Sequence, residues 1–117
     1  MTTDHTIDLH FTYRVTNPAR FEDYLNIALP LTQDEEPYVL EYSLARNSDG
    51  IVLQHERYEN EAAIAKHLEV TAEGQEAWNE ATELLDIRFV GPLSDEFFSK
   101  WEVPENSRWG RYRSIQR

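Results

Sequence analysis

The sequence predicts an α+β fold of the ferredoxin-like, split βαβ type (β-α-β-β-α-β), in which a four-stranded antiparallel sheet carries its helices on one face. Three observations predict it. Most of the candidate strand segments alternate side chains with the period of two that marks a strand. The segments between them place apolar residues at helical spacing. The order of these segments along the chain is that of the split βαβ motif.

The first half of the chain supplies a strand, a helix and a hairpin. Residues 6–15 alternate cleanly and predict the first strand. An Asn-Pro pair then begins a helix of about four turns, whose end Pro30 is expected to disturb. Residues 38–46 and 51–59 alternate again on either side of an Asn-Ser-Asp-Gly turn sequence, so we expect them to pair as an antiparallel hairpin.

The second half supplies two more helical segments and the last strand of the motif. Residues 60–70 and 72–85 have helical periodicity, with a bend expected near Thr71 or Gly74. Residues 86–90 predict the fourth strand, which a Gly-Pro pair ends. One face of this sheet is covered by the chain's own helices, while both faces carry apolar or aromatic residues. A second copy is the simplest cover for the other face, so we expect a homodimer.

Composition limits the class of protein. The chain has 117 residues, enough for one domain with a single core. A net charge of −11 argues against nucleic acid and against anionic membranes as partners. No apolar run approaches the length of a membrane span. Because the chain lacks cysteine, it has no thiolate metal site and no cysteine nucleophile, and a cytoplasmic location is the default expectation.

The C-terminal end differs in charge from the rest of the chain. Residues 106–117 carry a net charge of +4, whereas residues 1–105 carry −15. Such an end is often solvated and frayed, but this one also contains aromatic residues. We therefore expect residues 94–117 to form an extension of the domain at 1–93, docked on its body or on the partner subunit.

A short motif resembles a known family. Glu56-x-Tyr58 is followed by Glu61, by an Ala/Ile pair and by His67, eleven residues after Glu56. This pattern, over about residues 5–93, resembles the antibiotic biosynthesis monooxygenase (ABM) domain family. The resemblance implies a dimeric α+β barrel with a pocket between each subunit's helices and its sheet. It also implies a small cofactor-independent monooxygenase acting on an aromatic molecule of the phenol or quinol type.

The resemblance does not extend to the haem-degrading branch of the family. Members of that branch carry a downstream histidine that ligates iron. Around the corresponding position this chain has Trp78 and no histidine. No Gly-rich nucleotide motif and no histidine pair with metal-ligand spacing is present either. We therefore expect no cofactor and no metal.

Five residues are candidates for the site. His67 shares a helix face with Ile64 and Leu68, so it is expected to face the sheet or a pocket, where an imidazole could act as the acid or base. The other four candidates would contact the substrate: three aromatic residues that would line the pocket, and an arginine that could steady an anionic ligand; they are Tyr24, Tyr58, Trp78 and Arg88.

Each candidate has a structural alternative. His67 could be a core residue bonded to a backbone carbonyl, and Tyr58 and Trp78 could simply pack in the core. Arg88 could form a salt bridge, and Glu56 is expected to pair with an arginine such as Arg14, Arg57 or Arg88. The alternative function is accordingly a non-catalytic dimeric barrel that binds a small hydrophobic ligand or serves as an interaction module.

Overall fold

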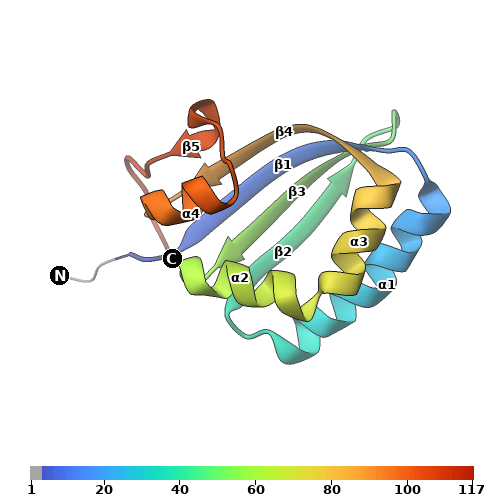
Figure 1. Ribbon diagram of the computed structural model, residues 1–117, viewed down its shortest axis with the longest axis horizontal. Coiled ribbons are helices and arrows are strands. Elements are labelled where there is room, and N and C mark those ends of the chain that lie inside the picture. Colours follow the sequence, from blue (N-terminus) through green and yellow to red (C-terminus); the bar gives the residue numbers. More distant parts are fainter. Residues whose placement is uncertain (1–3) are drawn as a thin grey trace.

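The computed structural model describes residues 4–117 and confirms the α+β fold (Figure 1). Its helices and strands follow one another along the chain as β1 (Ile7–Val15), α1 (Pro18–Glu35), β2 (Val39–Arg46), β3 (Ile51–Tyr58), α2 (Glu61–Val70), α3 (Ala72–Ala81), β4 (Thr82–Val90), α4 (Asp95–Lys100), the short 3-10 helix η1 (Glu105–Ser107) and β5 (Arg108–Trp109). Within residues 4–117, no helix is both long and apolar enough to cross a membrane.

Over residues 4–117 the sheet has five strands in the order β2-β3-β1-β4-β5, one more than expected. The first four are antiparallel, whereas β5 runs parallel to β4, so the sheet is mixed rather than purely antiparallel. Gly91 makes the extra pairing possible. Its φ of 131° suits glycine, a Cβ there would lie 2.7 Å from the carbonyl oxygen of Thr6, and its N–H donates to the carbonyl of Trp109 at 3.0 Å. Strand β5 was not predicted from the sequence because a two-residue strand has no periodicity.

Helix α1 continues through Pro30 to Glu35. A proline inside a helix removes one backbone hydrogen bond, and Pro30 was expected to disturb the end of this helix. Pro30 lies on the exposed side, where water can solvate the freed carbonyl. Ala28 and Thr32 on either side of it are buried, so core packing holds the helix together across the proline.

Helix α3 ends at Ala81, four residues earlier than the periodicity predicts, and β4 begins at Thr82. The carbonyl of Ala81 accepts hydrogen bonds from the backbone N–H groups of Thr16 and Asn17, at 2.8 and 3.1 Å. These bonds tie the end of the helix to the end of β1. The next residues therefore pair with β1 instead of continuing the helix.

The helices cover one face of the sheet, and the opposite face is open (Figure 1). Ile7, Leu9 and Tyr13 of β1 are buried on the covered face. The open face of β1 carries a charged or polar residue at each alternate position, namely Asp8, His10, Thr12 and Arg14. The open face is therefore more polar than the sequence pattern predicts.

Residues 94–117, which we call the C-terminal arm, pack against the rest of the chain over much of their length. Phe97 and Val103 are buried in one core cluster with Ile7 and Leu9. Farther along, Tyr112 and Ile115 are 81% and 83% exposed, so the apolar side chains at the end of the arm are not covered by this chain.

Candidate active site

A cavity of about 670 Å³ lies between the sheet and the helices, and we call it the helix–sheet pocket. Its floor comes from β1, β3 and β4, and its walls include residues of α1, α2, α3 and α4. Pockets that bind small molecules typically measure about 300–1,000 Å³. Three residues selected from the sequence, Tyr24, Tyr58 and Trp78, line this pocket. Most of the other lining side chains are apolar or aromatic.

Glu56 supplies a buried carboxyl group to this apolar pocket. It is only 5% exposed, and its two oxygens accept hydrogen bonds from the Tyr58 hydroxyl and, at 2.6 Å, from Nε2 of Gln54. Burial raises the pKa of the Glu56 carboxyl above its ordinary value. The charge of His67 and the two hydrogen bonds act in the opposite direction. A carboxyl group tuned in this way is suited to general acid–base chemistry.

The hydrogen bonds extend beyond Glu56 into a buried network. The hydroxyl of Tyr13 donates to Oε1 of Gln54 at 2.6 Å, and Nε2 of Gln54 also donates to the Tyr24 hydroxyl at 2.9 Å. The hydroxyls of Tyr24 and Tyr42 bond to each other. Burial raises the pKa of Tyr24, so this phenol stays protonated near neutral pH. The network therefore holds Gln54 in one orientation, with both amide hydrogens used.

The alternation of β3 explains how these polar groups reach the covered face. Gln54, Glu56 and Tyr58 lie two residues apart, so they share the face of Val52. Glu56 stands opposite Leu9 of β1 in the register of the sheet. The sequence does contain an indication of this network, because Gln54 and Glu56 repeat at every second position on the same side of the strand as apolar Val52. That indication was missed because Glu56 was expected to pair with an arginine.

The expected pairing of Glu56 with an arginine is wrong. All three candidate arginines pair with acids elsewhere: Arg14 with Glu83 at 3.2 Å, Arg57 with Asp8 at 3.0 Å, and Arg88 with Asp86 at 3.0 Å. Alternation accounts for this, because even-numbered Glu56 faces the helices while Arg57, its neighbour in the chain, faces away.

His67 is buried, but it does not line the helix–sheet pocket. It lies near the end of α2, where its Nδ1 is 2.9 Å from Oε1 of Glu36. Glu36 is itself 1% exposed and also accepts hydrogen bonds from the hydroxyls of Thr32 and Tyr38. Among the residues described, Nε2 of His67 has no hydrogen-bond partner. The imidazole is thus bonded to a buried carboxyl group rather than to a backbone carbonyl.

Trp78 lines the pocket and carries a buried indole N–H. Its Nε1 is buried and has no hydrogen-bond partner among the residues that the structure describes. The ring packs edge-on against Phe11 and Tyr13, at centroid distances of 5.9 and 5.1 Å, and it lines the pocket. An indole N–H usually finds a partner when it is buried, so the unpaired Nε1 of Trp78 is an exception among the described residues.

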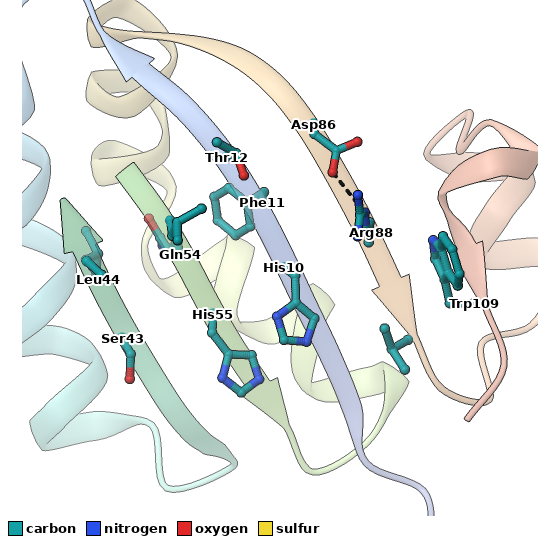
Figure 2. A pocket seen from close by; sticks show the side chains of 13 residues that line it. His10, Phe11, Thr12, Ser43, Leu44, Gln54, His55, Asp86, Arg88 and Trp109 are labelled. Atoms are coloured by element: carbon teal, nitrogen blue, oxygen red, sulfur yellow. Dashed lines mark ion pairs between the residues drawn. The ribbon is translucent and has the colours of Figure 1, made fainter. Parts of the chain in front are cut away.

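Arg88 lies on the other face of the sheet, away from the helix–sheet pocket. It lines a hollow of about 760 Å³ on the open face, where its guanidinium group lies 5.7 Å from the ring centre of Trp109 (Figure 2). Its salt bridge to Asp86 matches the structural alternative. Arg88 and the three aromatic candidates therefore do not share one pocket.

Comparison with solved structures gives the fold. MupZ from Pseudomonas fluorescens matches with a TM-score of 0.81 and 16% identity, over 100% of this chain and 93% of that chain. An inferred antibiotic biosynthesis monooxygenase from Caulobacter crescentus CB15 matches with a TM-score of 0.63 and 20% identity, over 78% of this chain and 92% of that one. The chain has an ABM-type fold. No protein-family model and no curated protein matches the sequence.

A third structure with the ABM-type fold is SnoaB from Streptomyces nogalater, a cofactor-independent oxygenase. It matches with a TM-score of 0.62 and 13% identity, over 77% of this chain and 95% of that chain. At such identities the likeness concerns the fold alone. The function of this chain must be argued from the pocket.

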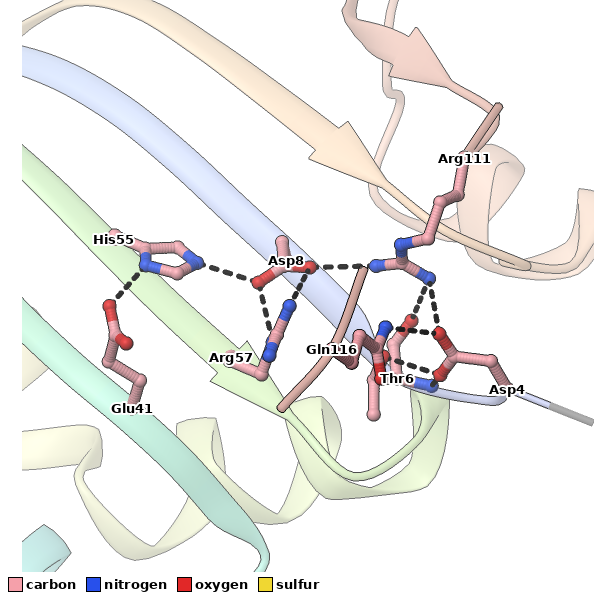
Figure 3. Close-up of polar contacts among 8 residues, drawn as sticks. All are labelled: Asp4, Thr6, Asp8, Glu41, His55, Arg57, Arg111 and Gln116. Carbon is pink, nitrogen blue, oxygen red and sulfur yellow. Dashed lines mark hydrogen bonds and ion pairs between the residues drawn. The ribbon is translucent and has the colours of Figure 1, made fainter. Parts of the chain in front are cut away.

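The possible metal ligands lie outside the helix–sheet pocket. Within the described part of the chain, the group whose ligand atoms lie within 4.8 Å of one another is Asp8, His10 and His55, on the open face. The two imidazoles are stacked, with 4.4 Å between centroids and 2° between planes. Since the ring nitrogen lone pairs lie in the ring planes, the lone pairs of two stacked rings lie in separate parallel planes and do not converge on one ion. Asp8 already binds Arg57 and Arg111, so the group does not fit a metal (Figure 3).

Proposed function

We propose that this protein binds an aromatic molecule of the phenol or quinol type in the helix–sheet pocket and oxygenates it with dioxygen, without a cofactor. One observation carries the proposal: among the residues that the structure describes, the aromatic-lined pocket contains a single buried carboxyl group, Glu56, whose pKa is raised by burial. Flat rings suit the aromatic walls, and a phenolic hydroxyl suits the carboxyl.

The chemistry assigned to Glu56 is removal of the phenolic proton. A phenolate is electron-rich enough to give an electron to dioxygen, so neither a metal nor a flavin is required. A quinol balances the reaction by itself, because it supplies all four electrons. One oxygen atom enters the ring as a hydroxyl group, the other leaves as water, and the product is a hydroxyquinone. The proton taken by Glu56 returns to the departing oxygen.

Two further side chains are assigned roles around this step. Nε1 of Trp78 has no partner among the described residues and lines the pocket, so it can donate to an oxygen of the bound ligand or of dioxygen. The charge of His67 lowers the pKa of Glu56 against the effect of burial. We therefore assign His67 to tuning Glu56 from behind the pocket rather than to contact with the substrate.

The proposed assembly is a homodimer that buries the open face of the sheet. Leu53 on this face is 61% exposed in the single chain, and the face also holds the hollow of about 760 Å³. Acidic and basic side chains alternate across it, with Glu41 beside His55 and Asp8 beside Arg57. A mixed surface of this kind can pair with its own copy about a two-fold axis.

A second function, ligand binding without catalysis, is favoured by one observation. Both oxygens of Glu56 already accept hydrogen bonds from Tyr58 and Gln54, as they would in a purely structural network. Oxygen uptake separates the two functions. With 1,4-naphthoquinol as the probe and a protein-free blank for autoxidation, an oxygenase consumes one dioxygen per quinol and yields the hydroxyquinone. A binding protein retains affinity for 2-naphthol in calorimetry but leaves oxygen uptake at the blank rate.

A further inference from the structure

The C-terminal arm contributes to both faces of the sheet. On the covered face, Phe97 and Trp101 line the helix–sheet pocket. On the open face, Trp109 lines the hollow that contains His10 and Arg88 (Figure 2). The arm therefore lies on the covered face at α4, joins the sheet beside β4 as the edge strand β5, and places one tryptophan on each face.

The part of the arm that reaches the pocket is held in place at its start. Ser94 caps α4, and its N–H and hydroxyl groups both donate to the carboxylate of Glu61, at 2.6 and 3.0 Å. Glu61 is the first residue of α2, so this pair fixes α4 to a wall of the pocket. Phe97 then packs against Phe89 of β4 at a centroid distance of 5.8 Å.

The arm is held again at the other end. Arg111 donates to the carbonyl of Thr6 at 3.1 Å and to Asp8 at 2.7 Å (Figure 3). Asp8 is 5% exposed, so this ion pair is mostly shielded from solvent. Anchors on both sides of α4 make it a fixed part of the pocket rather than a frayed end.

Trp101 is the exposed member of the aromatic pair in the pocket. Its side chain is 44% exposed, whereas Phe97 beside it, at a centroid distance of 6.3 Å, is 8% exposed. A large aromatic ring that lines a pocket and is half covered gains burial when a flat ligand fills the pocket. Phe97 supports the ring of Trp101 from the core side.

We propose that the C-terminal arm determines ligand size: Phe97 and Trp101 form an aromatic end wall that favours ligands of two or more fused rings over a single ring. The proposal rests on the proposed function, in which Glu56 binds the phenolic hydroxyl. A single ring held at Glu56 leaves the end wall uncovered. An extended ring system held at the same carboxyl group spreads across the pocket floor and stacks on Trp101.

The test measures binding by calorimetry with phenol, 2-naphthol and 2-hydroxyanthracene, using the full chain and no turnover. Wild-type protein is expected to bind the three-ring probe most tightly. Trp101→Ala should weaken the three-ring probe by about tenfold, the loss of one aromatic contact, and change phenol less than twofold. Trp109→Ala is the matched control, because Trp109 is 50% exposed on the same arm but lies on the other face.

Each outcome decides between the claims. If wild-type protein binds the probes but Trp101→Ala alters phenol and 2-hydroxyanthracene equally, or neither, the end wall does not select ligands and the inference is overturned while the proposed function stands. If wild-type protein binds none of the probes, the proposed function fails and the inference fails with it. Trp101→Phe, which keeps an aromatic ring, should restore most of the affinity for the three-ring probe, and circular dichroism checks that each variant is folded.

Discussion

Replacing Glu56 with glutamine tests the assigned base with little change in shape. The amide cannot take a phenolic proton, so the turnover number should fall by about 10²–10⁴-fold. The amide oxygen can still accept from the Tyr58 hydroxyl. Its NH₂ group, however, meets Nε2 of Gln54, which now donates to the carboxylate at 2.6 Å. One mismatched buried contact costs about 1–3 kcal/mol, so the variant should remain folded.

The pH dependence of stability gives this substitution a second readout. The folded-state pKa of Glu56 is raised above its ordinary value of 4.5, because burial penalises the charged form. The folded protein therefore holds this proton more tightly than the unfolded chain does. The resulting contribution to stability is fully present below the unfolded pKa and is lost as pH rises through the folded pKa. Glu56→Gln removes this contribution. The free energy of unfolding of the variant should therefore increase relative to that of the wild type as pH rises.

The assays are oxygen uptake with 1,4-naphthoquinol and urea unfolding between about pH 4 and 8. Wild-type turnover should increase as pH rises through the folded pKa of Glu56, since the ionised form is the base. The turnover of the variant should not show this increase. Glu22→Gln makes the same chemical change at an exposed position of α1 and is the control. The assignment is refuted if Glu56→Gln keeps more than a tenth of wild-type turnover, or if its lost activity equals the fraction of protein unfolded.

Three further predictions concern stability and assembly. His67→Ala should lower the free energy of unfolding by about 3–5 kcal/mol, because it breaks a buried pair with Glu36; a loss below about 1 kcal/mol in urea unfolding would contradict this. Deleting residues 94–117 removes the buried Phe97, worth about 3–5 kcal/mol by itself, so an unchanged melting temperature would show that the arm adds no stability. Leu53→Glu places a charge on the open face and should convert the proposed dimer to monomer in light scattering; a wild-type monomer at tens of micromolar would refute the proposed assembly.

The sequence predicted the elements whose pattern repeats. Alternation in residues 6–15 and the turn at 47–50 were enough for β1 and for the hairpin of β2 and β3. What could not be predicted depended on contacts between distant residues. Helix α3 ends where the N–H groups of Thr16 and Asn17 donate to the carbonyl of Ala81. Strand β5 pairs with β4 because Gly91, which has no Cβ, can lie against the carbonyl oxygen of Thr6. Neither contact changes the hydrophobic periodicity of the segment in which it occurs.

For the candidate site, too, residues placed by a repeating pattern were predicted, whereas contacts between distant residues were not. Tyr24, Tyr58 and Trp78 were predicted as pocket-lining residues, because a large aromatic side chain at a core-facing position must lie in or beside whatever cavity the core leaves. Helical phase alone could only say that His67 points inward. It could not distinguish the pocket from the buried carboxyl of Glu36, which comes from an irregular connection after α1. Arg88, by contrast, alternates along β4 with Ile87 and Phe89, which line the pocket, so the period of two places Arg88 on the opposite face of the sheet.

The position of Glu56 argues that the polar network is kept for more than stability. Opposite Leu9 in the centre of the sheet, an apolar side chain would avoid the desolvation of a carboxylate, and replacing buried ionic groups with apolar ones is often neutral or stabilising. Instead, β3 places Gln54 and Glu56 there, and the hydroxyls of Tyr13, Tyr24 and Tyr58 are needed to satisfy them. Local choices that work against the core are expected where a site requires them. Because this network reaches the pocket wall at Glu56, the chemistry of the protein is best sought at that carboxyl.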